Sequence, residues 1–165
     1  MEQPADTDAI YRLITEAFQN EAEAHLVDTM RERGELLISA VAEDAQQQVI
    51  GHIAFSPVTV ATNPKSLSGV GLAPMAVSPE HQRQGVGSQL IQYGLDRCRE
   101  LNVDFVVVLG HPEYYPRFGF QVASDCGFEN EYGGDDAFMA QELTPGGLFD
   151  CNGLVKYCSA FADLE

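Results

Sequence analysis

Gln82-Arg83-Gln84-Gly85-Val86-Gly87-Ser88 stands between an extended apolar segment and a segment with helical apolar spacing. Residues 70–77 before this stretch read as a strand, and residues 85–101 place their apolar side chains on one stripe of a helix. The run at 103–109 is almost continuously apolar, as expected of a strand covered on both faces. Strand, glycine loop, helix and strand form a crossover unit, so the two strands should be parallel neighbours. The predicted class is therefore α/β (α+β), with a mixed sheet and helices on both faces.

The glycine stretch also indicates a binding loop. Gly85 and Gly87 let backbone approach a ligand, and the following helix start supplies N–H groups that lack intrahelical partners. Arg83 can add a charge-assisted contact to a pyrophosphate. A P-loop is excluded because no Gly-Lys-Ser/Thr follows, and Leu90 stands where a dinucleotide motif has its third glycine. The same heptamer also fits a helix start that binds nothing.

The rest of the sequence predicts further strands and helices around this crossover unit. Pro74 lies inside the predicted strand 70–77, and proline enters sheets at edges or bulges, so this strand should diverge from a neighbour. The other predicted elements are helices at 6–20, 21–33 and 113–118, strands at 36–43, 49–61, 120–123 and 137–143, an edge strand at 154–157, and a turn or loop at 63–69.

Length and composition exclude several classes of protein. The chain has 165 residues, which suits a single domain over 1–165, and no apolar run approaches the roughly 18 residues of a membrane span. A net charge of −16 disfavours nucleic acid and anionic lipid as partners, and favours small cations. The four cysteines form no CxxC pair and the histidines are dispersed, so we expect no metal. With no secretory signal in view, a cytoplasmic location is expected.

Two further motifs carry a family resemblance. Tyr115-Pro116-Arg117-Phe118-Gly119-Phe120 follows the strand at 103–109, and Ala137–Leu143 precedes Pro145-Gly146. Together with the Gln-x-x-Gly-x-Gly loop at 82–87, these motifs resemble the GCN5-related N-acetyltransferase (GNAT) superfamily, in particular its bacterial branch of small YhbS-type acetyltransferases. The resemblance spans about residues 5 to 160 and rests on the order and spacing of the motifs.

The resemblance implies a cofactor site. In this family a bulged strand splays from its neighbour, and the pantetheine arm of acetyl-CoA, the acyl donor, enters the gap. The pyrophosphate then lies on backbone amides of the glycine loop. Carried over to this sequence, the strand and loop residues expected to bind acetyl-CoA are Met75, Ala76, Val77, Arg83, Gln84, Gly85, Val86, Gly87 and Ser88.

The resemblance also implies a general acid. The tyrosine four residues before the motif glycine, here Tyr115, is expected to protonate the departing thiolate of CoA. A phenol suits this role because its reference pKa of about 10 keeps it protonated at neutral pH. The alternative is an aromatic side chain that only packs in the core, a reading that fits its neighbour Tyr114 better.

The general base is less well defined. Many family members place a glutamate on one of the two central strands, whereas this chain has Ala73, Met75 and an apolar run there. His111, after the second strand, is the substitute we favour, since an imidazole can accept a proton near neutral pH. The alternative is that His111 only forms hydrogen bonds with the backbone at the N-terminus of a helix. Weaker candidates are Glu113, His52 and Glu43.

These residues predict an acyl-CoA-dependent N-acetyltransferase that moves an acetyl group to a primary amine. The alternatives are a non-catalytic acyl-CoA sensor and an unrelated nucleotide-binding domain. Acidic residues outside the motifs point to a cationic acceptor, although a solvated loop explains most of them better: Glu21, Glu23, Glu129, Glu131, Asp135 and Asp136. Homodimers are common in the superfamily, so a homodimer is a possible assembly. Family members commonly begin with a strand before the first helix, and we expect this sequence to have little of it.

Overall fold

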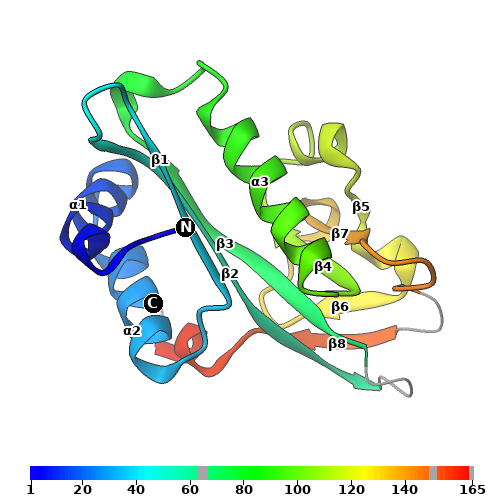
Figure 1. Ribbon diagram of the computed structural model, residues 1–165. Coiled ribbons are helices and arrows are strands. Elements are labelled where there is room, and N and C mark those ends of the chain that lie inside the picture. The colour runs from blue at the N-terminus through cyan, green and yellow to red at the C-terminus, as the bar shows by residue number, and fades with distance from the viewer. Residues whose placement is uncertain (63–66, 149–151, 164–165) are drawn as a thin grey trace. The chain divides into compact units, whose positions relative to one another are not determined.

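The computed structural model describes residues 1–62, 67–148 and 152–163 (Figure 1). The chain forms two compact units, the first from 1–56, 73–94 and 159–165, the second from 57–72 and 95–158. The predicted turn residues 63–66 and Cys151 lie outside the described residues. The helices are α1 (Thr7–Phe18), α2 (Ala22–Arg33) and α3 (Val86–Glu100), and the strands are β1 (Ile38–Glu43), β2 (Val49–Thr62), β3 (Gly69–Val77), β4 (Phe105–Leu109), β5 (Gln121–Val122), β6 (Phe128–Asn130), β7 (Phe138–Glu142) and β8 (Asn152–Lys156).

In the first unit, α1 and α2 form a hairpin of two helices, drawn in blue in Figure 1. Apolar residues recur at helical spacing in α1, and Ile10, Leu13 and Ile14 are buried as that spacing predicts. Gly34 ends α2 in the left-handed conformation with φ of 71°, which confirms the predicted stop. The helix pair therefore follows directly from the sequence pattern.

Helices cover both faces of the sheet in the first unit. Strand β1 pairs antiparallel with β2, and successive side chains of β2 alternate between the two faces. A Cβ at Gly51 would lie 2.9 Å from side-chain atoms of Val86 and Leu90, so this face packs against α3. The next residue, His52, contacts Ser39 on the opposite face, where α2 also lies. This arrangement confirms the predicted layers.

In the second unit the strand order is β5, β7, β4, β3, β2, β8 and β6. Residues Gly69–Leu72 of β3 run parallel to Phe105–Val108 of β4, as the crossover predicts. That register stops just before Pro74, whose ring nitrogen has no hydrogen for a ladder. Strand β4 pairs antiparallel with β7, which pairs antiparallel with β5. The predicted irregularity therefore falls where the proline stands.

The C-terminal strand differs from its prediction. Strand β8 is not an edge strand, because it pairs antiparallel with β2 and parallel with β6. The sequence gave no signal for β6, whose three residues are too few to show a period. Strand β5 covers only two of the four residues predicted at 120–123, because a 3-10 helix begins at Ala123.

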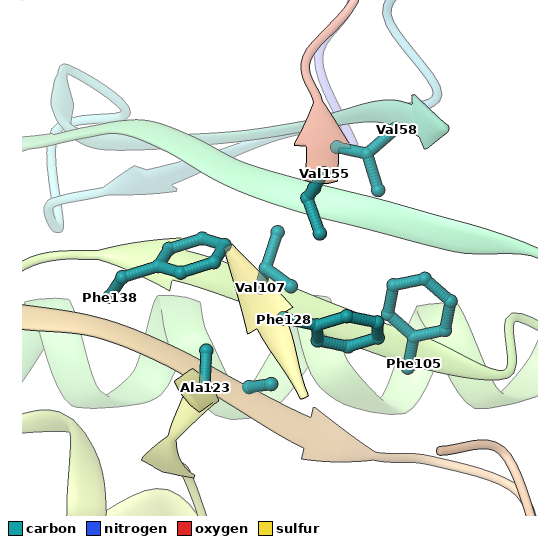
Figure 2. Packing of buried hydrophobic residues seen from close by; sticks show 8 residues of the cluster. Val58, Phe105, Val107, Ala123, Phe128, Phe138 and Val155 are labelled. Atoms are coloured by element: carbon teal, nitrogen blue, oxygen red, sulfur yellow. The ribbon is translucent and has the colours of Figure 1, made fainter. Parts of the chain in front are cut away.

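A hydrophobic cluster forms the centre of the second unit (Figure 2). Phe105 of β4 and Phe128 of β6 pack with ring centroids 5.3 Å apart. Val58 and Val155 approach from β2 and β8, and Val107 lies between them and the aromatic rings. The cluster thus holds β4 between strands that are distant in sequence. None of the helices in the described ranges has the length and apolarity to cross a membrane.

Candidate functional site

The predicted binding loop is anchored to the end of β3. The Ser78 amide donates to the carbonyl of Ile50 on β2 at 2.8 Å, which fixes the point where the chain leaves the sheet. After a 3-10 turn at Pro79–His81, the Gln82 side chain reaches back and donates to the Val77 carbonyl at 3.2 Å. Gln82 therefore ties the loop to the strand, a role that sequence reasoning did not assign although Gln82 begins the motif.

The loop presents backbone toward open space. Arg83 and Gly85 adopt left-handed conformations, with φ of 65° and 86°. Apart from Gly85 itself and its chain neighbours Gln84 and Val86, none of the described residues has an atom within 4 Å of the place where a Gly85 Cβ would stand. The first rung of α3 is the bond from the Gln89 amide to the Gly85 carbonyl, at 3.0 Å. The amides before Gln89 therefore lie at the positive end of the helix, which favours an anion.

The first turn of α3 supports the same reading. In this described turn there is no acidic residue that would repel an anion. Upstream, Met75–Val77 form the last part of β3, and the peptide bond between Ala73 and Pro74 is cis. The structure thus brings the predicted strand residues and loop residues together in the first unit, as one continuous strand-loop-helix segment.

The predicted tyrosine lies in the second unit, after β4. The helix predicted at 113–118 is wrong in extent, because only Tyr115–Phe118 are helical and the geometry is 3-10. Pro116 occupies its second position and restricts Tyr115 before it, which disfavours a longer α-helix. The amide of Tyr115 donates to the His111 carbonyl at 3.3 Å, and Gly119 ends the turn with φ of 102°.

Tyr115 is buried, with 7% of its surface exposed. Its ring makes edge contacts with Tyr114 and Phe120, at centroid distances of 5.2 and 5.6 Å. A Cβ at Gly110 would overlap the Tyr115 ring, so the glycine makes room for it. Sequence reasoning expected Tyr114 to be the packed residue, but Tyr114 is only half-buried. Burial raises the pKa of Tyr115 to about 12, so the phenol keeps its proton at neutral pH.

The candidates for the general base differ in how far their side chains are exposed to solvent. His111 and Glu113 are exposed at the carboxyl end of β4, close in sequence to Tyr115. The His111 carbonyl also accepts the Tyr114 amide at 3.1 Å, which agrees with the backbone role and leaves the imidazole exposed. Glu43 is exposed at the end of β1, in the first unit, whereas the acid and base candidates after β4 belong to the second.

His52 is unsuited to the role of base because it has no exposed surface. Its Nε2 lies 2.8 Å from the Ser39 hydroxyl, which donates its single hydrogen to the Glu2 carboxylate at 2.5 Å. His52 must therefore donate from Nε2, which leaves Nδ1 as a buried acceptor that none of the described groups satisfies. Burial lowers the pKa of His52 to about 4.

Arg31 completes this partly buried network from α2. Its Nε and Nη2 donate to the two Glu2 oxygens at 2.8 and 2.9 Å, and Nη1 donates to Asp28 at 2.6 Å. Hydrogen bonds from Arg31 and Ser39 outweigh burial and lower the pKa of Glu2. Sequence reasoning missed this network, because its members are separated by up to fifty residues and share no motif.

The fold and loop define a class of protein, and comparison with known proteins agrees. The sequence model of the acetyltransferase (GNAT) domain family matches residues 2–123. The chain belongs to this family, and its fold is the GNAT fold, with a mixed sheet and helices.

Particular relatives are close in sequence and structure. The chain is 40% identical over 162 residues to the uncharacterized N-acetyltransferase YhbS of Escherichia coli K12, covering 98% of this chain and 96% of that protein. The crystal structure of E. coli YhbS in complex with CoA superposes with a TM-score of 0.92 at 39% identity, covering 98% of this chain and 89% of that one. A GNAT acetyltransferase from Brucella melitensis in complex with acetyl-CoA gives a TM-score of 0.80 at 34% identity, covering 97% and 94%.

Proposed function

We propose that this protein transfers an acetyl group from acetyl-CoA to a primary amine. The observation that carries the proposal is the loop at 82–88, where Arg83 and Gly85 are left-handed and residues 82–85 are exposed just before the start of α3. Relatives at 39% and 34% identity are described in complex with CoA and with acetyl-CoA. A cytoplasmic location, expected from the sequence, is part of the proposal.

The loop residues fit a pyrophosphate. The amides of residues 83–88 offer donors at a helix N-terminus, and the exposed Arg83 side chain offers a charged donor. Met75–Val77, which the Gln82 side chain joins to this loop, hold the strand backbone that would bond the pantetheine arm. The proposal assigns acetyl-CoA to the strand and loop residues that the sequence analysis named for it.

Tyr115 acts as the acid in this proposal. The acceptor nitrogen attacks the thioester carbonyl carbon, the carbon–sulfur bond breaks, and the electron pair leaves on sulfur. Tyr115 gives its phenolic proton to that sulfur, and burial keeps the phenol protonated until it is needed. A strand amide near Val77 stabilises the oxyanion, as a preorganised donor does in acyl transfer.

His111 is the proposed base. It takes the proton that the amine nitrogen loses, so one proton leaves the nucleophile as another reaches the sulfur. Its exposed position beside the Tyr115 turn allows exchange of that proton with solvent. A His111→Gln variant should bind acetyl-CoA normally and lose turnover, by about 10²-fold for removal of a general base.

The test compares two neighbouring tyrosines. Release of free CoA thiol from acetyl-CoA is followed in the presence of a panel of primary amines. Tyr115→Phe should lower kcat by about 10²-fold with unchanged affinity for acetyl-CoA. Tyr114→Phe, the matched control, should keep the rate of the unmodified protein. Equal rates in both variants would remove Tyr115 from the mechanism.

One observation favours an acyl-CoA sensor as the second candidate. The apolar β4 and positions Ala73 and Met75 offer no carboxylate where many family members have one. A sensor would bind acetyl-CoA, release no thiol with any amine, and be indifferent to Tyr115→Phe. Thiol release that depends on both the amine and Tyr115 would exclude the sensor.

A further inference from the structure

The candidate binding loop between β3 and α3 is held at both ends by consecutive residues of β2. At its beginning, the Ser78 amide donates to the Ile50 carbonyl at 2.8 Å. At its end, the side chains of Val86 and Leu90 on α3 lie over the next residue, Gly51. All of these residues belong to the first unit. The position of the end of the loop therefore depends on how closely α3 approaches Gly51.

The approach at Gly51 is close because this residue has no side chain. A Cβ there would lie 2.9 Å from Val86 Cγ1 and 2.9 Å from Leu90 Cδ1. Restoring an ordinary carbon–carbon separation of about 3.5 Å needs a shift of about 0.6 Å. The end of a leucine can rotate away, whereas a valine in a helix has one strongly preferred χ1 rotamer. An added methyl group at Gly51 would therefore displace the backbone of Val86, where α3 begins.

A second glycine contact holds α3 at a point farther from the loop. There the glycine is on the helix, because a Cβ at Gly94 would overlap the ring of Phe55 on β2. The four strand steps from Gly51 to Phe55 cover about 13 Å, and the eight helix steps from Val86 to Gly94 rise about 12 Å. The two contacts therefore match in spacing along β2 and α3. With the far contact fixed, added bulk at Gly51 acts on the end of α3 that joins the loop.

We propose that Gly51 is a positioning residue for acetyl-CoA. Its missing side chain lets α3 begin close to β2, which places the Val86 amide and the amides before it where the pyrophosphate is bound. Gly51 acts through Val86 and not by contact with the ligand. The inference rests on the proposed function, because that function assigns the pyrophosphate to this loop. A shift of the helix start misaligns the donors, and hydrogen bonds weaken with distance and angle.

The test measures the affinity of each variant for CoA by isothermal titration calorimetry, after circular dichroism has shown that the variant is folded. Gly51→Ala adds the methyl group. Gly51→Ala combined with Val86→Ala removes the side chain that the methyl group meets and keeps the Val86 amide, and Val86→Ala alone is its reference. Gly147→Ala is the matched control, because Gly147 is buried in the second unit and its Cβ would overlap the carbonyl oxygen of Asp104.

We expect Gly51→Ala to weaken CoA binding at least about tenfold, as misalignment of charge-assisted hydrogen bonds to a phosphate would do. The double variant should bind CoA within about threefold of Val86→Ala alone, because the overlap is relieved. Gly147→Ala should lower the Tm and keep the native affinity for CoA. Positioning of the loop then separates from general stability.

Native CoA affinity in Gly51→Ala, or a loss that Val86→Ala does not restore, would overturn the positioning role. An equal loss of affinity in Gly147→Ala would also overturn it, since affinity would then follow stability alone. If Gly51→Ala does not fold, Val86→Ile replaces it and adds a methylene group on the helix side; native CoA affinity in that variant would overturn the role. Failure of the unmodified protein to bind CoA would instead overturn the proposed function.

Discussion

His52 should make the stability of this protein sensitive to mild acid. The native imidazole has a pKa of about 4 because it is buried, whereas an unfolded chain has a histidine pKa of about 6.5. Between pH 6.5 and pH 4, His52 is therefore mostly protonated in the unfolded state and mostly neutral in the native state. The contribution of neutral His52 to the free energy of unfolding is fully present above pH 6.5 and is lost as the pH falls toward 4.

The magnitude follows from the two pKa values. At about 1.4 kcal/mol for each tenfold change in acidity, the full loss is about 3 kcal/mol below pH 4. About 2 kcal/mol of it should be lost between pH 7 and pH 5. The groups that face His52 are Ser39 and, through it, Glu2 and Arg31. The pKa of Glu2 is lowered, so protonation of its carboxyl reduces the free energy of unfolding only at a pH below the interval from 7 to 5.

Urea unfolding followed by circular dichroism at pH 7 and pH 5 measures this loss, and the pI of about 4.4 sets the lower limit for soluble protein. His52→Gln keeps a donor toward Ser39 and removes the titration. The native protein should lose about 2 kcal/mol more than the variant over this interval. His111→Gln, a change at an exposed site, should behave like the native protein. An equal loss in the native protein and in His52→Gln would refute the reasoning.

Three further outcomes can be measured with the same protein. Ser39→Ala removes the hydroxyl that joins Glu2 to His52 and should lower the free energy of unfolding by about 1–3 kcal/mol in urea titration. Gly94→Ala should lower it by about 1–3 kcal/mol, because the new methyl group overlaps the Phe55 ring; an unchanged midpoint would contradict the packing of α3. Because the pKa of Tyr115 is about 12, the rate of acetyl transfer should show no loss of the general acid up to pH 10, whereas half-loss near pH 10 would indicate an unperturbed phenol.

The sequence predicted the parts of the fold that depend on local pattern. The period of apolar residues identified α3 and β4, and the crossover rule gave the parallel pairing of β3 with β4. Pro74 predicted a break in that pairing because its chemistry excludes a ladder hydrogen bond. These features are decided within a few residues, so they can be read before folding brings distant segments together.

Features that depend on distant pairing could not be read. Strand β6 has three residues, and its role comes from β8, to which it pairs only in the folded chain. The burial of Tyr115 depends on Gly110, whose missing side chain leaves space for the ring. The sequence shows the apolar run that ends at Leu109, but it does not show that Leu109 is exposed while the residues before it are buried.

Binding of acetyl-CoA tests the central claim most directly. Thermal unfolding is recorded with acetyl-CoA, CoA and ATP at matched concentrations. A ligand at 100 times its dissociation constant stabilises the native state by about 2.7 kcal/mol, which gives a clear rise in Tm. The loop at 82–88 predicts such a rise with acetyl-CoA and CoA and none with ATP. No rise with either CoA species, or an equal rise with ATP, would contradict the assignment of this loop to acyl-CoA.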